Sequence, residues 1–118
     1  MSDEVRPIHG ELARFSSSMI LTIDTTDREL ITVSLSEGGK VVKKMEDRNQ
    51  FGSQALLPLI EKLLSDQGIG FSELEGVEVA TGPGSFTGIR VGASVANALG
   101  YSLGIPVNGK RLETEFNY

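Results

Sequence analysis

A glycine-rich segment in the second half of the chain constrains its fold more than any other feature. Residues 82–88 read GPGSFTG and lie between an apolar run at 76–81 and a helical pattern at 88–103. Glycines at such a place let the backbone turn sharply and let its N–H groups come close to an anion. The pattern predicts a strand, a tight turn and a helix, which together form a unit of an α/β domain.

Four other segments predict strands. The continuous apolar run at 19–23 is typical of a strand buried on both faces, and the alternation at 30–36 indicates a half-buried strand. The two glycines in 37–39 predict a hairpin turn into a third strand at 40–45, where lysines suit the edge of a sheet. A short last strand is expected at 105–108. Together with the run before the glycine-rich segment, these make five strands.

Two amphipathic helices complete the pattern. Ser53 is placed to cap a helix that runs to Gln67, and Gly68 stops it. Pro58 predicts either a bend or a later start, because proline lacks the N–H that a helix interior needs. The second helix is expected at 88–103. The order β-β-β-α-β-α-β predicts a meander followed by two crossovers that add parallel strands, in two or three layers.

Composition excludes several kinds of function. The chain has 118 residues, no cysteine, one histidine (His9) and a net charge of −5. Disulfide scaffolds, zinc knuckles and catalysis by cysteine or histidine are therefore not expected, and the acidic balance argues against a large nucleic-acid contact. No apolar run approaches the roughly 18 residues of a membrane span, and residues 1–14 lack the apolar core of a signal peptide. We expect a cytoplasmic protein with a mobile tail at 1–18 and one folded lobe at 19–118.

Polar side chains after two predicted strands form a candidate phosphate site. One group follows the first strand, and the glycine-rich segment follows the fourth. Because neighbouring parallel strands end at the same edge of a sheet, we expect the two groups to lie together. The carboxylate of Asp24 is suited to a hydrated magnesium ion, and the hydroxyls are suited to phosphate. The candidate residues are Asp24, Thr25, Thr26, Gly82, Gly84, Ser85, Thr87 and Gly88.

Both halves of this site have a purely structural alternative. Asp24 is equally suited to an Asx turn, and the residue chemistry of the glycines favours close packing in a tight turn somewhat over phosphate contact. The segment is not a Walker A loop, because Ile89 and Arg90 stand where that motif needs lysine followed by serine or threonine. Residue chemistry alone leaves phosphate contact and a structural turn both open.

The helix at 88–103 carries two apolar stripes, one of small residues spaced by four and one of larger residues. One stripe must cover the sheet, and ridge-and-groove packing against a partner helix suits the other. A small domain has little interior in which to hide both, so we expect an exposed helix interface. The small stripe is Gly92, Ala96, Gly100 and Gly104, and the other is Val91, Val95, Ala98 and Leu99.

These residues resemble a known family. The segments LTIDTT (21–26), SQALLPLIEKLL (53–64) and above all VATGPGSFTGIRVGASVANALG (79–100) are similar to the TsaB (YeaZ) family. That family is the non-catalytic paralogue in the bacterial machinery that makes threonylcarbamoyladenosine on tRNA. The resemblance, which covers residues 19–109, implies an actin-like ATPase (ribonuclease H-like) subdomain. Such a subdomain has a mixed five-stranded sheet of order 3-2-1-4-5 with two main helices.

The resemblance also implies partners. TsaB-like proteins pair with the catalytic paralogue TsaD, support the ATPase TsaE and self-associate. The resemblance therefore implies that tRNA is contacted only indirectly. The paralogues associate mainly through the two helices of this subdomain, which implies an interface for a homodimer or for a TsaD-like partner. The implied interface residues are Leu56, Leu57, Ile60, Leu64, Val91, Gly92, Val95, Ala96, Leu99 and Gly100.

Two departures from the family pattern bear on function. TsaB-like chains usually continue into a second lobe, and ATP lies between two lobes in this superfamily, so a single lobe offers half a cleft for Mg-ATP. The paired histidines that TsaD carries beyond the fifth strand have no counterpart in GKRLETEF (109–116), so we expect neither a metal site nor catalytic residues. The leading hypothesis is a non-catalytic scaffold. The alternatives are half of a two-lobed phosphate-transferring enzyme and a truncated product without independent activity.

Overall fold

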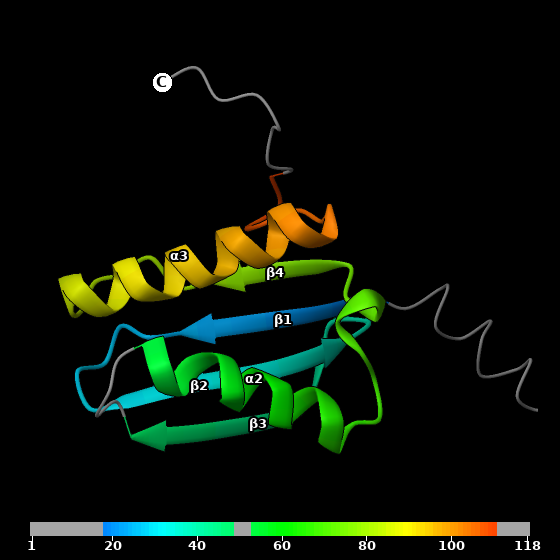
Figure 1. Cartoon of the computed structure of the whole chain (residues 1–118), viewed down its shortest axis with the longest axis horizontal. Helices are drawn as coiled ribbons and strands as arrows, with labels where there is room; N and C mark the ends of the chain where they lie inside the picture. Colours follow the sequence, from blue (N-terminus) through cyan, green and yellow to red (C-terminus); the bar gives the residue numbers. More distant parts are fainter. Residues whose placement is uncertain (1–17, 49–52, 111–118) are drawn as a thin grey trace, which may run out of the picture.

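The computed structural model describes residues 18–48 and 53–110, which form one sheet and two long helices (Figure 1). The predicted tail, apart from Ser18, and the segment 111–118 lie outside the described residues. The elements are β1 (Met19–Asp24), β2 (Leu30–Glu37), β3 (Lys40–Arg48), α2 (Ser53–Asp66), the short 3-10 helix η1 (Phe71–Glu73), β4 (Gly76–Val79) and α3 (Phe86–Leu103).

The sheet has the strand order β3-β2-β1-β4, which confirms the predicted order of the first four strands. β1 pairs antiparallel with β2 and parallel with β4, as a hairpin followed by a crossover through α2 requires. The register places Leu21 between Leu35 on one side and Val77 on the other. Because side chains alternate along a strand, the apolar residues of these three strands share one face of the sheet.

Both helices cover this apolar face, α2 over β2 and β3 and α3 over β1 and β4 (Figure 1). No described element covers the other face. The prediction that β1 is buried on both faces is therefore wrong: Leu21 and Ile23 are fully buried, but Ile20 and Thr22 are only half-buried. The described part of the chain is a two-layer lobe. Its largest fully buried side chains are Leu21, Ile23, Ile31, Leu35, Leu56, Ile60, Leu63 and Leu64.

α2 begins at Ser53 and continues through Pro58, so the later start that proline suggested is not observed. Pro58 is exposed, and water can satisfy the carbonyl that the missing proline N–H leaves unpaired. Leu56, Ile60 and Leu63 anchor the buried side of the helix. Burial of this side outweighs the local cost of one exposed proline.

α3 begins at Phe86, earlier than the predicted start at Gly88. The reason is a side-chain cap, because the Ser85 hydroxyl accepts a hydrogen bond from the Gly88 N–H at 3.1 Å. At its other end the helix stops at Gly104, which adopts a left-handed conformation with φ of 68°.

The predicted fifth strand at 105–108 is reduced to an isolated bridge. Val107 pairs parallel with Val77, on the outer side of β4 where the fifth strand was expected. Asn108 then turns with φ of 51°, so the backbone cannot continue the ladder. The Asn108 side-chain amide continues it instead: Oδ1 accepts from the Val79 N–H at 2.8 Å, and Nδ2 donates to the Val79 carbonyl at 3.2 Å.

Because the Asn108 amide takes the place of a strand backbone beside Val79, we predict that Asn108→Asp strongly lowers stability. The carboxylate keeps the size of the amide but places an acceptor against the Val79 carbonyl. We expect the free energy of unfolding in urea at neutral pH to fall by about 1–3 kcal/mol. Asn97→Asp, the same change at an exposed position of α3, is the control and should stay within about 0.5 kcal/mol of the original chain. Equal effects of the two variants would contradict a special role of Asn108.

Candidate functional site

The glycine-rich loop and the turn after β1 meet at one edge of the sheet. The Ala80 N–H donates to the Ile23 carbonyl at 2.9 Å, which continues the pairing of β1 with β4. The Ser85 N–H then donates to the Thr26 carbonyl at 2.7 Å. Gly84 leaves no room for a side chain, because a Cβ there would lie 2.5 Å from the Thr26 carbonyl oxygen. Most of the candidate phosphate residues therefore lie together in the fold.

Asp24 forms an Asx turn. Its Oδ1 accepts hydrogen bonds from the Thr26 N–H at 2.9 Å and from the Thr26 hydroxyl at 2.6 Å. These two bonds occupy the carboxylate oxygen and the hydroxyl that were candidates for a magnesium ion and for phosphate. The geometry matches the structural alternative that the sequence left open for this turn.

Thr25 joins the same turn to α3. It is buried, and its hydroxyl donates to the Gly88 carbonyl at 2.5 Å. The helix comes this close because Gly88 and Gly92 lack side chains: a Cβ at Gly88 would collide with the Thr25 carbonyl oxygen, and one at Gly92 with the Thr25 hydroxyl. The hydroxyl is thus used inside the protein and does not face a ligand.

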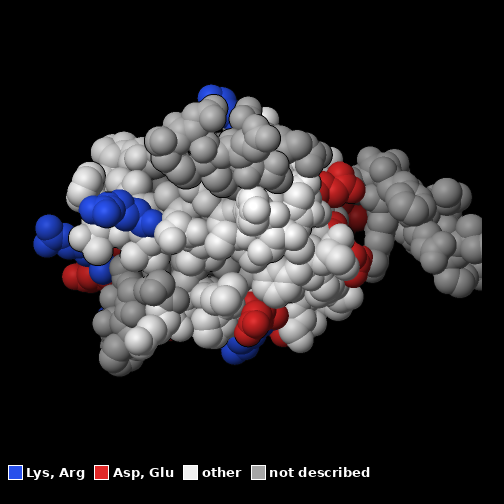
Figure 2. Space-filling model, turned by 45° about the horizontal axis from the view of Figure 1, so that its top comes forward, with Lys and Arg blue, Asp and Glu red and all other residues white. Residues whose placement is uncertain are grey.

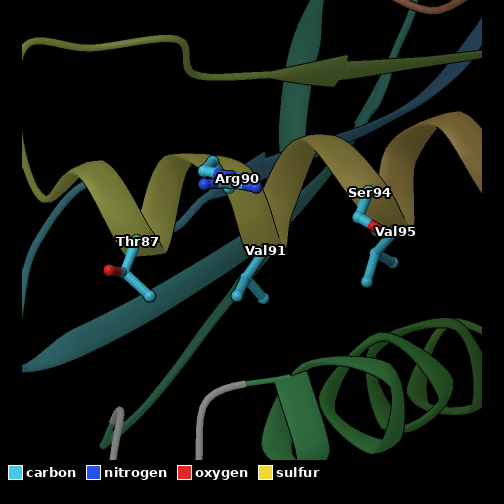
Figure 3. A pocket seen from close by; sticks show the side chains of 5 residues that line it. All are labelled: Thr87, Arg90, Val91, Ser94 and Val95. Atoms are coloured by element: carbon cyan, nitrogen blue, oxygen red, sulfur yellow. The ribbon is translucent and has the colours of Figure 1, made fainter.

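The remaining candidates lie at the surface. Gly82 and Gly84 are exposed in the loop before α3. Thr87 is exposed as well, but it belongs to a hollow along α3, and it points with Val91 toward the side where α2 lies (Figure 3). The hollow is lined by Thr87, Arg90, Val91, Ser94 and Val95.

Clusters that hold metal ions need several histidine, cysteine, aspartate or glutamate side chains. Within residues 18–48 and 53–110, no group of three or more such side chains is placed to do so. None of the helices in these ranges is long and apolar enough to cross a membrane.

Six residues predicted to contact a partner are instead buried inside the lobe. The small stripe of α3 faces the sheet, because only small residues let the helix lie so close to Thr25 and Val79. Three of the four large residues of α2 in the predicted interface belong to the core, where their apolar area is buried. The corrected residues are Gly92, Ala96, Gly100, Leu56, Ile60 and Leu64. Gly104, placed in the same stripe, is an exposed helix cap.

The other predicted interface residues keep some contact with solvent. Leu57 on α2 is 41% exposed. On α3, Val91, Val95 and Leu99 are half-buried, and they pack against the core from the side of the helix next to the small stripe. Arg90 is the one charged residue of α3. The described surface around α3 is accordingly mostly uncharged, with charged side chains at its margins (Figure 2).

Two aromatic side chains at the ends of α3 add to this surface, although sequence analysis did not single them out as interface residues. Phe86 is 74% exposed and Tyr101 is 55% exposed. The Arg90 guanidinium lies 5.8 Å from the centre of the Phe86 ring, in cation–π range. Helical spacing alone did not show that these rings remain outside the core.

The sheet order, the two helices on one face and the strand-to-helix loop define an actin-like, ribonuclease H-like α/β lobe. The family model described as TsaD, tRNA N6-adenosine threonylcarbamoyltransferase, matches residues 46–109. The solved structure "YeaZ from Pseudomonas aeruginosa" superposes with a TM-score of 0.69 at 31% identity, covering 76% of this chain and 43% of that one. The chain belongs to the TsaB (YeaZ) family.

Curated relatives agree with this assignment. A tRNA threonylcarbamoyladenosine biosynthesis protein TsaB from Haemophilus influenzae is 33% identical over 88 residues, which are 75% of this chain and 37% of that protein. TsaB from Bacillus subtilis is 34% identical over 96 residues, which are 80% of this chain and 42% of that protein. The chain therefore spans about two fifths of the length of these relatives.

The fit between the turn and α3 predicts the effect of Gly88→Ala. The new methyl group would collide with a backbone carbonyl, which cannot move aside as a side chain can. We expect the free energy of unfolding to fall by about 1–3 kcal/mol in urea denaturation. Gly70→Ala is the matched control, because a Cβ there meets nothing within 4 Å. It should leave stability unchanged or raise it by up to about 1 kcal/mol; a Gly88→Ala variant as stable as this control would refute the close approach.

Proposed function

We propose that this chain is a non-catalytic scaffold lobe in tRNA threonylcarbamoyladenosine biosynthesis. It acts by docking, through the outward sides of α2 and α3, to a TsaD-like paralogue or to a second copy of itself. A TsaE-like ATPase joins the assembly, and tRNA is contacted only indirectly. Membership in the TsaB (YeaZ) family, together with the names of the curated relatives, supports the process.

The surface of α3 is the observation that carries the docking role. A helix with a single charged residue, Arg90, and with exposed aromatic rings near both ends has the composition of an interface core, where lysine and acidic residues are depleted and aromatic residues and arginine are enriched. Val91 and Val95 line a hollow beside this face and offer apolar contacts for a partner helix. Leu57 adds an exposed apolar side chain on α2.

The use of polar groups in the turn also favours docking over catalysis. The hydroxyls of Thr25 and Thr26 and one carboxylate oxygen of Asp24 are engaged in hydrogen bonds within the lobe. A catalytic group must be free to exchange protons or to contact substrate. These groups stabilise the edge that carries α3, and so support its outward face.

A charge on this face should prevent docking. We expect Val95→Asp to weaken binding to a TsaD-like protein at least tenfold, because a carboxylate would be desolvated in an apolar contact. Isothermal titration calorimetry measures the loss. Ser72→Asp adds the same charge at an exposed position in η1, away from both long helices, and should bind as the original chain does. Equal binding by the Val95→Asp variant would refute the proposed face.

A second candidate function is half of a two-lobed phosphate-binding enzyme that uses Asp24, Thr25, Thr26 and the glycine-rich loop. It is favoured by the exposed backbone of Gly82 and Gly84 ahead of α3, since helix N-termini attract anions. Calorimetry and thermal unfolding with millimolar Mg-ATP distinguish the two functions. We expect no binding heat and no shift in melting temperature for a scaffold, whereas saturable binding would favour the phosphate-binding alternative.

A further inference from the structure

β3 forms an outer edge of the sheet, and its far side pairs with no strand in the described part of the chain (Figure 1). It is the longest strand described, from Lys40 to Arg48, and most of its residues are exposed. Val41 and Val42 are 61% and 43% exposed. The unpaired N–H and C=O groups of such an edge are a template for another strand, which proteins normally block.

The charges of β3 do not block this edge in the usual way. Lysines alone would repel any second copy, but here the sequence KKMED (43–47) has two lysines before Met45 and two acidic residues after it. An antiparallel second copy reverses this order. If the two-fold axis passes through Met45, Lys44 lies opposite Glu46 and Lys43 lies opposite Asp47, and each pair occurs twice.

The pairing with β2 shows on which face each charge lies. Lys44 and Glu46 are opposite Ser34 and Thr32, on the face of the sheet that no described helix covers. They already approach each other within one copy at 4.0 Å. Lys43, Met45 and Asp47 are on the face that carries the helices. A two-fold axis perpendicular to the sheet keeps these faces matched, so each lysine meets an acid on its own side.

Neighbouring registers are unfavourable. Residues that are opposite each other must have their side chains on the same side of the sheet. The two-fold axis therefore passes through a residue, and the nearest alternatives to Met45 are Lys44 and Glu46. With the axis at Lys44, that lysine faces its own copy; the bulge at Val42 ends the regular alternation of β3 beyond this point. With the axis at Glu46, two glutamates face each other and Lys44 faces Arg48. Like charges directly opposite are destabilising, so the charge pattern selects the register centred on Met45.

The geometry points to the edge of β3 as a docking site for β3 of a second copy of this chain. The two strands pair antiparallel about Met45 and join the two sheets into one. Backbone hydrogen bonds supply affinity, and the four lysine–carboxylate pairs supply register and specificity. This edge borders α2, which packs over β3, but β2 and β1 separate it from β4 and from most of α3. One chain can therefore use this edge together with the outward face of α3. Because the paired charges are exposed, association by this edge weakens as salt rises.

Reversing either the two lysines or the two acidic residues of β3 tests this proposal. The variants Lys43→Glu/Lys44→Glu and Glu46→Lys/Asp47→Lys each place like charges opposite one another in the proposed register. Sedimentation equilibrium at low salt should show at least tenfold weaker self-association of each variant alone. An equimolar mixture of the two should recover association, and the quadruple variant that combines all four changes should associate as the original chain does.

The outcomes separate this edge from the helix surface. Association that neither half-reversal weakens would overturn the β3 edge, while leaving docking through α2 and α3 intact. A mixture that fails to recover association would overturn it too, as would an original chain that stays monomeric at low salt. Conversely, Val95→Asp should impair binding to the TsaD-like protein without changing pairing through β3.

A disulfide trap tests the register directly, since the chain has no cysteine of its own. Facing residues of antiparallel strands have Cβ atoms about 4.5–5.5 Å apart, near the range that a disulfide spans. Met45→Cys should therefore form a covalent dimer under mild oxidation. In Val41→Cys the two thiols would be separated by about 27 Å along the strands, although Val41 is more exposed. Equal cross-linking of both variants would overturn the register.

Discussion

The contact between the turn after β1 and the first turns of α3 determines the geometry of this lobe. The Thr25 hydroxyl reaches the Gly88 carbonyl, and Gly88 and Gly92 let the helix approach the turn closely. The Ser85 N–H bonds to the Thr26 carbonyl at the same edge. These contacts fix the angle at which α3 leaves the loop, and therefore which of its sides faces the sheet. Every interface assigned to the helix depends on that orientation.

The same contacts give several candidate phosphate residues partners within the lobe. Two hydroxyls and one carboxylate oxygen form hydrogen bonds inside the chain. The polar residues that follow β1 thus hold the edge of the sheet from which α3 begins.

Sequence patterns predicted most of the fold, because the periodicities were strong. Alternation in β2, the lysines of β3 and the leucines of α2 each agree with the structure. The fifth strand failed because backbone pairing with β4 stops at a single bridge between Val107 and Val77, after which the Asn108 side chain pairs with Val79. The dipeptide Asn108-Gly109 was a turn signal that marked the end of pairing. Nothing in the sequence marked the side-chain amide as a strand mimic.

The sequence by itself determined the element order, the strand-to-helix turn and the family, because these follow from local residue types and from a distinctive glycine-rich segment. Tertiary structure alone decided which stripe of α3 is buried. Small residues at spacings of four suit either the sheet or a partner, and the close approach of Thr25 draws them inward. Tertiary structure also placed the charges of β3 on a sheet edge that no other described strand pairs with, since burial and strand partners depend on contacts between segments distant in the chain.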